Sequence, residues 1–189
     1  MFNNIPILLT WARILLIPVV IGVFYVPADV LSIHHKNVFA CVVFVVAALT
    51  DWFDGYLARS WGQTSNFGAF LDPVADKLMV SAALAVLLQL DRCDALVAFV
   101  IIGREITISA LREWMAKIGA SKSVAVSFVG KLKTTAQMVA IPMLLYHDDL
   151  LGLPIQIMGT VLIVVAAVLT VWSMIYYLRK AAPDLRRES

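Results

Sequence analysis

Four aspartates within residues 51–76 are the side chains best suited to chemistry in this 189-residue chain. Asp51 and Asp54 come directly after an apolar run, and their spacing of three residues places them about 60° apart around a helix. Asp72 and Asp76 are four residues apart, which is about 40° around the next helix. Each pair therefore shares one helix face, and the short connection favours neighbouring helices on which the four carboxylates converge.

Clustered carboxylates need positive countercharge, because four anions cannot all stay ionised in a medium of low dielectric constant. Hard divalent cations bind oxygen ligands, and paired metal ions hold both the attacking and the leaving oxygen in phosphoryl displacement. The aspartates therefore predict a Mg²⁺ or Mn²⁺ site. A structural alternative makes Asp72 a helix N-cap followed by Pro73 at the first helical position, and makes Asp54-Gly55 a turn.

The composition predicts an all-α, polytopic membrane protein. Apolar residues make up 61% of the chain and the mean hydropathy is +0.88, which is more apolar material than a soluble domain of this length can bury. The net charge of +2 disfavours a nucleic-acid partner. Cys41 and Cys93 are too few for a disulfide framework.

Six apolar runs are long enough to be membrane helices, and no long linker separates them, so we expect one domain over residues 1–189. Arg13 interrupts the first run, which favours a retained helix over a signal peptide. The runs are Ile5–Tyr25, Val38–Ala58, Pro73–Leu90, Ala95–Lys117, Ser123–Tyr146 and Pro154–Leu178.

The basic residues between these runs predict the orientation. The gaps after the first, third and fifth runs hold only Lys36 and Arg92 as basic residues, together with five aspartates. The other side carries seven lysines and arginines and should be cytoplasmic, with both termini there. Those residues are Arg59, Lys117, Lys122, Arg179, Lys180, Arg186 and Arg187.

The aspartate segment matches a specific pattern, D-x2-D-G-x2-A-R-x8-G-x3-D-x3-D, filled at every fixed position. This pattern resembles the signature of the CDP-alcohol phosphotransferase family, and the six-helix arrangement is similar to that family over nearly the whole chain. The resemblance implies a membrane enzyme of lipid synthesis with two divalent metal ions, Mg²⁺ or Mn²⁺, held by Asp51, Asp54, Asp72 and Asp76. It also implies that Gly55, Ala58, Arg59 and Gly68 line the site of a CDP-linked lipid.

Three further segments resemble the bacterial branch of the family that uses glycerol 3-phosphate: NIPILLTWARILLIP, GREITISALREWMA and GKLKTTAQMVA. The resemblance places Arg104, Arg112, Lys131 and Lys133 at the phosphate of that acceptor. Arg104 and Arg112 are about 80° apart on one helix, so both can reach one pocket. Lys131 and Lys133 are about 200° apart and cannot both do so, which favours Lys131 unless the helix begins late.

Together these features predict an enzyme of the bacterial inner membrane that moves a phosphatidyl group from CDP-diacylglycerol to glycerol 3-phosphate. Asp76 is the expected general base, and the family resemblance implies a homodimer. Two alternatives remain at this point. The first keeps the chemistry but uses another acceptor, such as inositol phosphate. The second is a divalent-cation transporter with carboxylates near the membrane midplane.

Overall fold

A computed structural model describes residues 5–61, 66–119 and 128–188 of the chain. Within its helices, the side chains at 5–6, 52–61, 66, 69, 128–129, 131 and 181–188 lie outside the described part. The described backbone is helical apart from short connections. Its helices are α1 (Ile5–Gly22), the 3₁₀ turn η1 (Val23–Tyr25), α2 (Ile33–Trp61), α3 (Asn66–Gln89), α4 (Ala95–Lys117), α5 (Phe128–Tyr146) and α6 (Ile155–Glu188).

These bounds agree with the predicted runs at most ends, and α4 matches its run at both ends. Residues 123–127 of the fifth run lie outside the described residues. Two ends differ more: α6 continues to Glu188 rather than ending at Leu178, and α3 begins at Asn66 rather than at Pro73. The alternative of Asp72 as an N-cap is therefore wrong, because Asp72 lies inside the helix and Pro73 is an internal residue. Helix-breaking prolines are tolerated in such helices because neighbouring groups satisfy the freed carbonyl.

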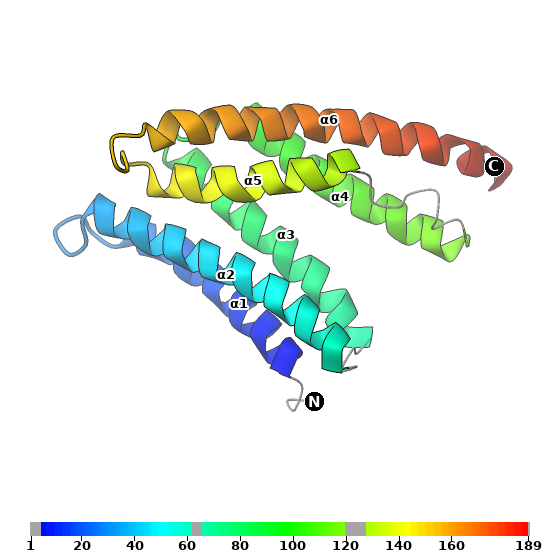
Figure 1. Ribbon diagram of the computed structural model, residues 1–189, viewed down its shortest axis with the longest axis horizontal. Coiled ribbons are helices and arrows are strands. Elements are labelled where there is room, and N and C mark those ends of the chain that lie inside the picture. Colours follow the sequence, from blue (N-terminus) through cyan, green and yellow to red (C-terminus); the bar gives the residue numbers. More distant parts are fainter. Residues whose placement is uncertain (1–4, 62–65, 120–127, 189) are drawn as a thin grey trace.

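The helices form two groups that separate toward one end of the molecule (Figure 1). Helices α5 and α6 lie antiparallel along one side, and their mutual packing is the most extensive in the fold. Helix α4 packs on α6, and α2 packs on α5. Helix α1 packs against both α2 and α3, whereas α2 and α3 contact each other little over the described residues. Helices α2 and α3, which carry the aspartates, are therefore held near each other mainly by their packing against α1.

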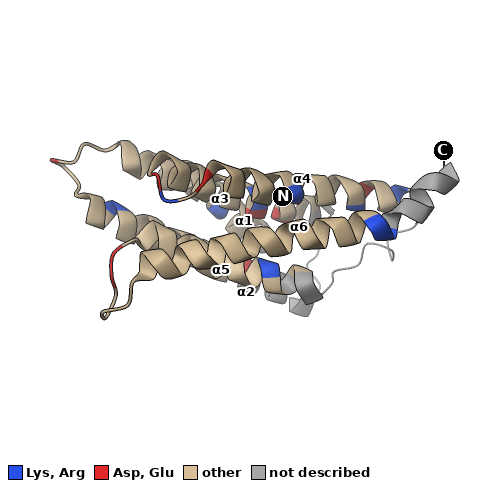
Figure 2. Ribbon diagram, turned by 90° about the horizontal axis from the view of Figure 1, so that it is seen from above, with Lys and Arg blue, Asp and Glu red and all other residues tan. Residues whose placement is uncertain are grey.

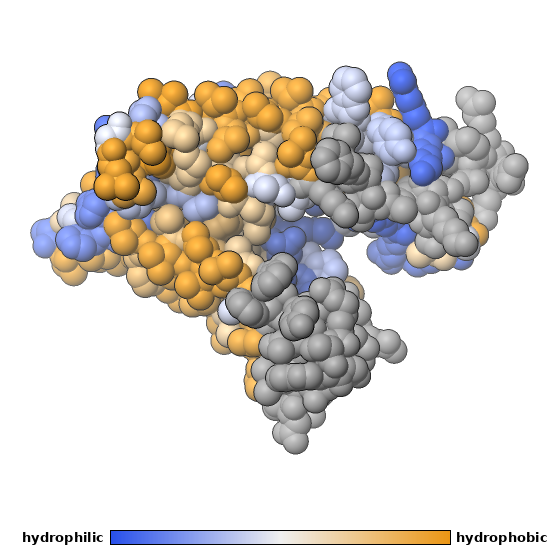
Figure 3. All heavy atoms as spheres, in the orientation of Figure 1, coloured by the Kyte–Doolittle hydropathy of each residue, from blue (hydrophilic) through white to orange (hydrophobic). Residues whose placement is uncertain are grey.

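On the face shown in Figure 3, hydrophobic residues cover much of the described surface, with hydrophilic residues toward the two ends and in the hollow between the helices. Leu15, Phe99 and Val168 are exposed large hydrophobic side chains on three different helices, which is expected of a surface in contact with lipid. Among the described residues, three helical segments are long and apolar enough to cross a membrane: Ile7–Tyr25, Ile33–Asp51 and Ile155–Lys180. Charged residues are few along the described helices, and most of the ribbon in Figure 2 carries neither an acidic nor a basic residue.

The connections at the end away from the aspartates are held by Arg92, between α3 and α4. Its Nη1 donates to Oδ1 of Asn37 at 3.0 Å and to the carbonyl oxygen of Leu145 at 3.0 Å. Arg92 thereby joins α2 to the last turn of α5 and satisfies a carbonyl that a helix end leaves unpaired. The Asp94 side chain accepts a hydrogen bond from the backbone nitrogen of Leu96 at 2.8 Å and caps α4.

Candidate active site

Helix α1 supplies polar side chains to two of the four aspartates. Thr10 Oγ1 donates to Asp72 Oδ1 at 2.7 Å, which joins α1 to α3. Arg13 Nη1 forms an ion pair with Asp51 Oδ1, which joins α1 to α2. Thr10 and Arg13 are both buried, so these contacts are made inside the bundle. One turn of α1 therefore positions a carboxylate on each neighbouring helix.

Asp51 and Asp76 come together at a small cavity that Arg13 also lines. Asp76 lies at the boundary between this cavity and a larger one of about 570 Å³. The larger cavity is enclosed by α3 and α4, and its lining includes Lys77, Arg104 and Arg112. Asp76 is thus the one aspartate of the described three that faces both the other carboxylate and the basic residues.

The donor chemistry of these residues fits a hard divalent cation. Asp51, Asp72 and Asp76 offer only carboxylate oxygens, which is the ligand type that Mg²⁺ and Mn²⁺ prefer. Among the described side chains, no group of three His, Cys, Asp or Glu residues converges closely enough to hold a metal ion. The fourth predicted ligand, Asp54, lies on α2 among the side chains outside the described part. In this arrangement Arg13 provides the positive charge beside Asp51.

Two arginines of α4 form the basic wall of the larger cavity, as their spacing predicts. Arg104 is buried and Arg112 is half-buried, and both line the cavity. Their Nε atoms are buried and have no hydrogen-bond partner among the described residues. A guanidinium group offers five donors in a fixed plane that suits phosphate oxygens. The cavity therefore places these two phosphate-type donors beside Asp76, together with the carboxylates of Glu105 and Glu113 in the same lining.

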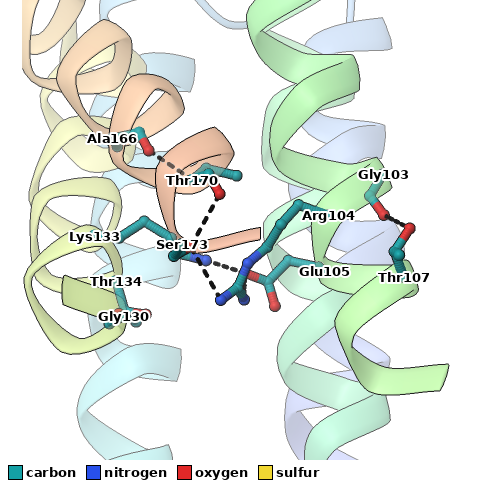
Figure 4. Close-up of polar contacts among 10 residues, drawn as sticks. All are labelled: Gly103, Arg104, Glu105, Thr107, Gly130, Lys133, Thr134, Ala166, Thr170 and Ser173. Atoms are coloured by element: carbon teal, nitrogen blue, oxygen red, sulfur yellow. Dashed lines mark hydrogen bonds and ion pairs between the residues drawn. The ribbon is translucent and has the colours of Figure 1, made fainter. Parts of the chain in front are cut away.

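Lys133 reaches the same region from α5 but is held behind Glu105 (Figure 4). Only 1% of the Lys133 side chain is exposed, and its Nζ forms an ion pair with Glu105 Oε1. Glu105 Oε1 also lies 3.5 Å from Arg104 Nη1, and Arg104 Nη2 donates to Ser173 Oγ of α6 at 3.3 Å. Lys133 thus contributes positive charge to the site without itself lining the cavity.

The other predicted residues are only partly placed. Gly68 is buried in the first turn of α3. Gly55, Ala58 and Arg59 lie on the last part of α2, and Lys131 lies near the start of α5. The side chains of those four positions are outside the described part, so their predicted contacts with substrate are not visible here.

Several residues of the candidate site are not among those predicted from the sequence. Arg13 interrupts an apolar run, and an ionisable residue inside a membrane helix points to function by default. Thr10 precedes Arg13 by three residues and so shares its helix face. On α6, Ser173 and Tyr177 are four residues apart in a strongly apolar segment, and this spacing could have indicated a buried polar face.

Comparison with known proteins places the chain in a family. A family model described as CDP-alcohol phosphatidyltransferase matches residues 3–172. The chain is 50% identical over 184 residues to proteins of Shigella flexneri serotype 5b (strain 8401), Shigella boydii serotype 4 (strain Sb227) and Escherichia coli (strain K12). Each of these relatives is named "CDP-diacylglycerol--glycerol-3-phosphate 3-phosphatidyltransferase", and each match covers 96% of this chain and 97% of the relative. The protein belongs to the CDP-alcohol phosphatidyltransferase family.

Proposed function

We propose that this protein transfers the phosphatidyl group of CDP-diacylglycerol to glycerol 3-phosphate, forming phosphatidylglycerophosphate and CMP. The observation that carries the proposal is the position of Asp76, between a cavity shared with Asp51 and a cavity lined by Arg104 and Arg112. A base candidate therefore lies where a phosphorylated alcohol, bound through its phosphate, presents its hydroxyl group. The names of the relatives give the same pair of substrates.

Each substrate has a set of proposed binding residues. Asp51, Asp54, Asp72 and Asp76 hold two divalent ions, Mg²⁺ or Mn²⁺, which when bound balance the charge of the pyrophosphate and polarise its phosphoryl oxygens. Gly55, Ala58, Arg59 and Gly68 line the cytidine diphosphate site. Arg104 and Arg112 donate hydrogen bonds to the acceptor phosphate, and Lys131 is a further residue that binds it. Lys133 does not touch the phosphate; it is paired with Glu105 and adds its positive charge from behind that residue.

In the reaction, Asp76 accepts the proton of the primary hydroxyl group of glycerol 3-phosphate. The hydroxyl oxygen attacks the phosphorus that bears the diacylglycerol, and the bond from that phosphorus to the CMP oxygen breaks. Arg104 and Arg112 hold the acceptor phosphate in place, which turns the encounter of two substrates into a reaction within one complex. Thr10 and Arg13 keep the carboxylates of Asp72 and Asp51 in fixed orientations.

The membrane arrangement is proposed with the function. All six helices form one domain, residues 1–189, that spans the inner membrane of a bacterium, with both termini and the acceptor cavity on the cytoplasmic side. Charged residues in α3, α4 and α5 lower their hydropathy, and we attribute this to the site they line rather than to a position outside the bilayer. The family resemblance favours a homodimer.

The proposal is tested with purified protein, CDP-diacylglycerol and a panel of acceptors comprising glycerol 3-phosphate, inositol phosphate, glycerol and serine. Release of CMP and the lipid product are both measured. Metal-dependent CMP release with glycerol 3-phosphate, abolished by chelation and restored by Mg²⁺ or Mn²⁺, is expected. Faster CMP release with inositol phosphate than with glycerol 3-phosphate would show that inositol phosphate is the acceptor. Absence of CMP release with every acceptor would contradict the proposal and favour a transporter.

A further inference from the structure

Tyr177 of α6 contacts both of the arginines that line the larger cavity. Its ring centroid is 5.7 Å from Cζ of Arg104 and 5.5 Å from Cζ of Arg112. Tyr177 is completely buried, whereas both arginines reach the cavity wall. One aromatic ring on α6 therefore contacts two guanidinium groups that are eight residues apart on α4.

Two neighbouring guanidinium groups repel each other, and the repulsion grows as the surroundings become less polar. Without a partner between them, the flexible side chains would separate or turn toward solvent. The face of an aromatic ring carries negative electrostatic potential and attracts cations within about 6 Å of its centroid. The Tyr177 ring can thus hold both positive charges near one point.

The position of the ring is fixed by packing rather than by the arginines. Tyr177 packs with Ile108 and Met115 of α4 in a small core cluster, separate from the main core. Ser173, one turn earlier on the same face of α6, accepts a hydrogen bond from Arg104 Nη2 at 3.3 Å (Figure 4). Arg104 is therefore held from α6 at two places, and Tyr177 is the contact that it shares with Arg112.

We propose that Tyr177 is a positioning residue that orients Arg104 and Arg112 as a pair for the phosphate group of the acceptor. This inference rests on the proposed function, because it assigns the acceptor phosphate to the cavity lined by the two arginines. Tyr177 acts through the arginines and does not itself line that cavity.

The test replaces Tyr177 by phenylalanine and by phenylalanines carrying increasing numbers of ring fluorines. Fluorination withdraws electron density from the ring face while nearly conserving its shape, so packing is kept and the attraction for cations declines. Tyr177→Phe keeps the aromatic ring and is the reference for the fluorinated series. Along the fluorinated series, the Kd of glycerol 3-phosphate, measured by calorimetry, should rise by about 5- to 30-fold, as the loss of two cation–π contacts implies.

The kinetic constants separate positioning from a general structural role. The KM for glycerol 3-phosphate should rise along the series, while the KM for CDP-diacylglycerol stays unchanged and kcat changes little. Trp172→Leu is the matched control, because Trp172 is an exposed aromatic residue of the same helix. This control should leave both KM values unchanged.

A Kd for glycerol 3-phosphate that does not change along the fluorinated series would overturn the assignment of Tyr177. The same holds if the original protein does not bind glycerol 3-phosphate. Protein that binds glycerol 3-phosphate with the expected dependence on fluorination, yet releases no CMP, would support the role of Tyr177 while contradicting the proposed reaction.

Discussion

Arg13 of α1 and Asp51 of α2 form an ion pair in which the arginine side chain is 3% exposed and the aspartate 42% exposed. The guanidinium group of Arg13 thus lies beside one of the proposed metal ligands. Arg13 therefore has two effects: it stabilises the ionised carboxylate before metal binds, and it repels a metal ion once one is present.

Replacing Arg13 by Met is expected to lower stability in the absence of divalent ions, because the carboxylate of Asp51 loses its partner. Since Asp51 is partly exposed, the loss should be about 1 kcal/mol, nearer to the range for surface pairs than to that for buried ones. Mg²⁺ should then raise the Tm of Arg13→Met by more than it raises that of the original protein. Equal shifts of Tm with Mg²⁺ in the two proteins would disprove the competition between Arg13 and metal.

Thr10→Val tests the hydrogen bond to Asp72, which is 2.7 Å long. Valine keeps the branched shape but cannot donate, so Asp72 becomes less well oriented. Loss of a partner that orients a metal ligand typically weakens metal affinity by about 10- to 100-fold. We therefore expect the Mg²⁺ concentration for half-maximal CMP release to rise within that range.

The control is Thr160→Val. Thr160 is exposed on α6 and bonds only to the carbonyl oxygen of Gln156 in its own helix among the described contacts. Its replacement should leave the Mg²⁺ requirement unchanged. If both variants change that requirement equally, Thr10 has no specific role in positioning Asp72.

The turn after α5 predicts a pH dependence of stability. Burial, and next the positive charge of Arg92, lower the pKa of His147, while Asp148 partly opposes them. The folded protein therefore binds this proton less readily than the unfolded chain, whose histidine has a pKa of about 6.5. With respect to His147, the folded protein therefore has its full stability above about pH 6.5, and it loses stability as the pH falls below that value.

His147→Asn should reduce the loss of Tm between pH 7.5 and pH 5.5. Asparagine suits the positive φ of 68° at this position, so the backbone of the turn is conserved. The nearby hydrogen bond between His34 Nδ1 and Asp148 Oδ2, 2.6 Å long, is present in both proteins, so it does not affect the comparison. An unchanged loss of Tm would show that His147 does not produce the dependence.

The proposed topology places Asp91 outside the cell membrane and Lys117 in the cytoplasm. Both are exposed positions, and a single cysteine at either one can be labelled with a reagent that does not cross membranes. In a background without Cys41 and Cys93, Asp91→Cys should react in intact cells, and Lys117→Cys only after permeabilisation. The reverse pattern would overturn the orientation and the cytoplasmic supply of glycerol 3-phosphate.

The sequence was sufficient to predict the helices and the residues that carry charge. Hydropathy gave six runs because membrane helices must be continuous and apolar, and the bounds of α4 were predicted at both ends. The predicted start of α3 at Pro73 was wrong. Proline normally marks the first turn of a helix, and a proline inside a membrane helix produces the same local sequence pattern.

The contacts between helices could not be predicted in the same way. Helical periodicity shows that Arg104 and Arg112 share a face, but not that Tyr177 of α6 lies against both of them. Likewise, the chain order suggested that α2 and α3 are direct neighbours. In the described residues α1 packs against each of them instead, which is why Thr10 and Arg13 were not recognised as site residues.

The most direct test of the proposed site is the turnover of Asp76→Asn with CDP-diacylglycerol and labelled glycerol 3-phosphate at saturating metal. Asparagine keeps the size of the side chain and one oxygen but cannot accept the proton. The variant should still bind CDP-diacylglycerol, while CMP release and incorporation of the label into lipid fall together by about 10²- to 10⁴-fold. Near-normal turnover, with CMP and labelled lipid formed in equal amounts, would contradict the role of Asp76 and the mechanism built on it.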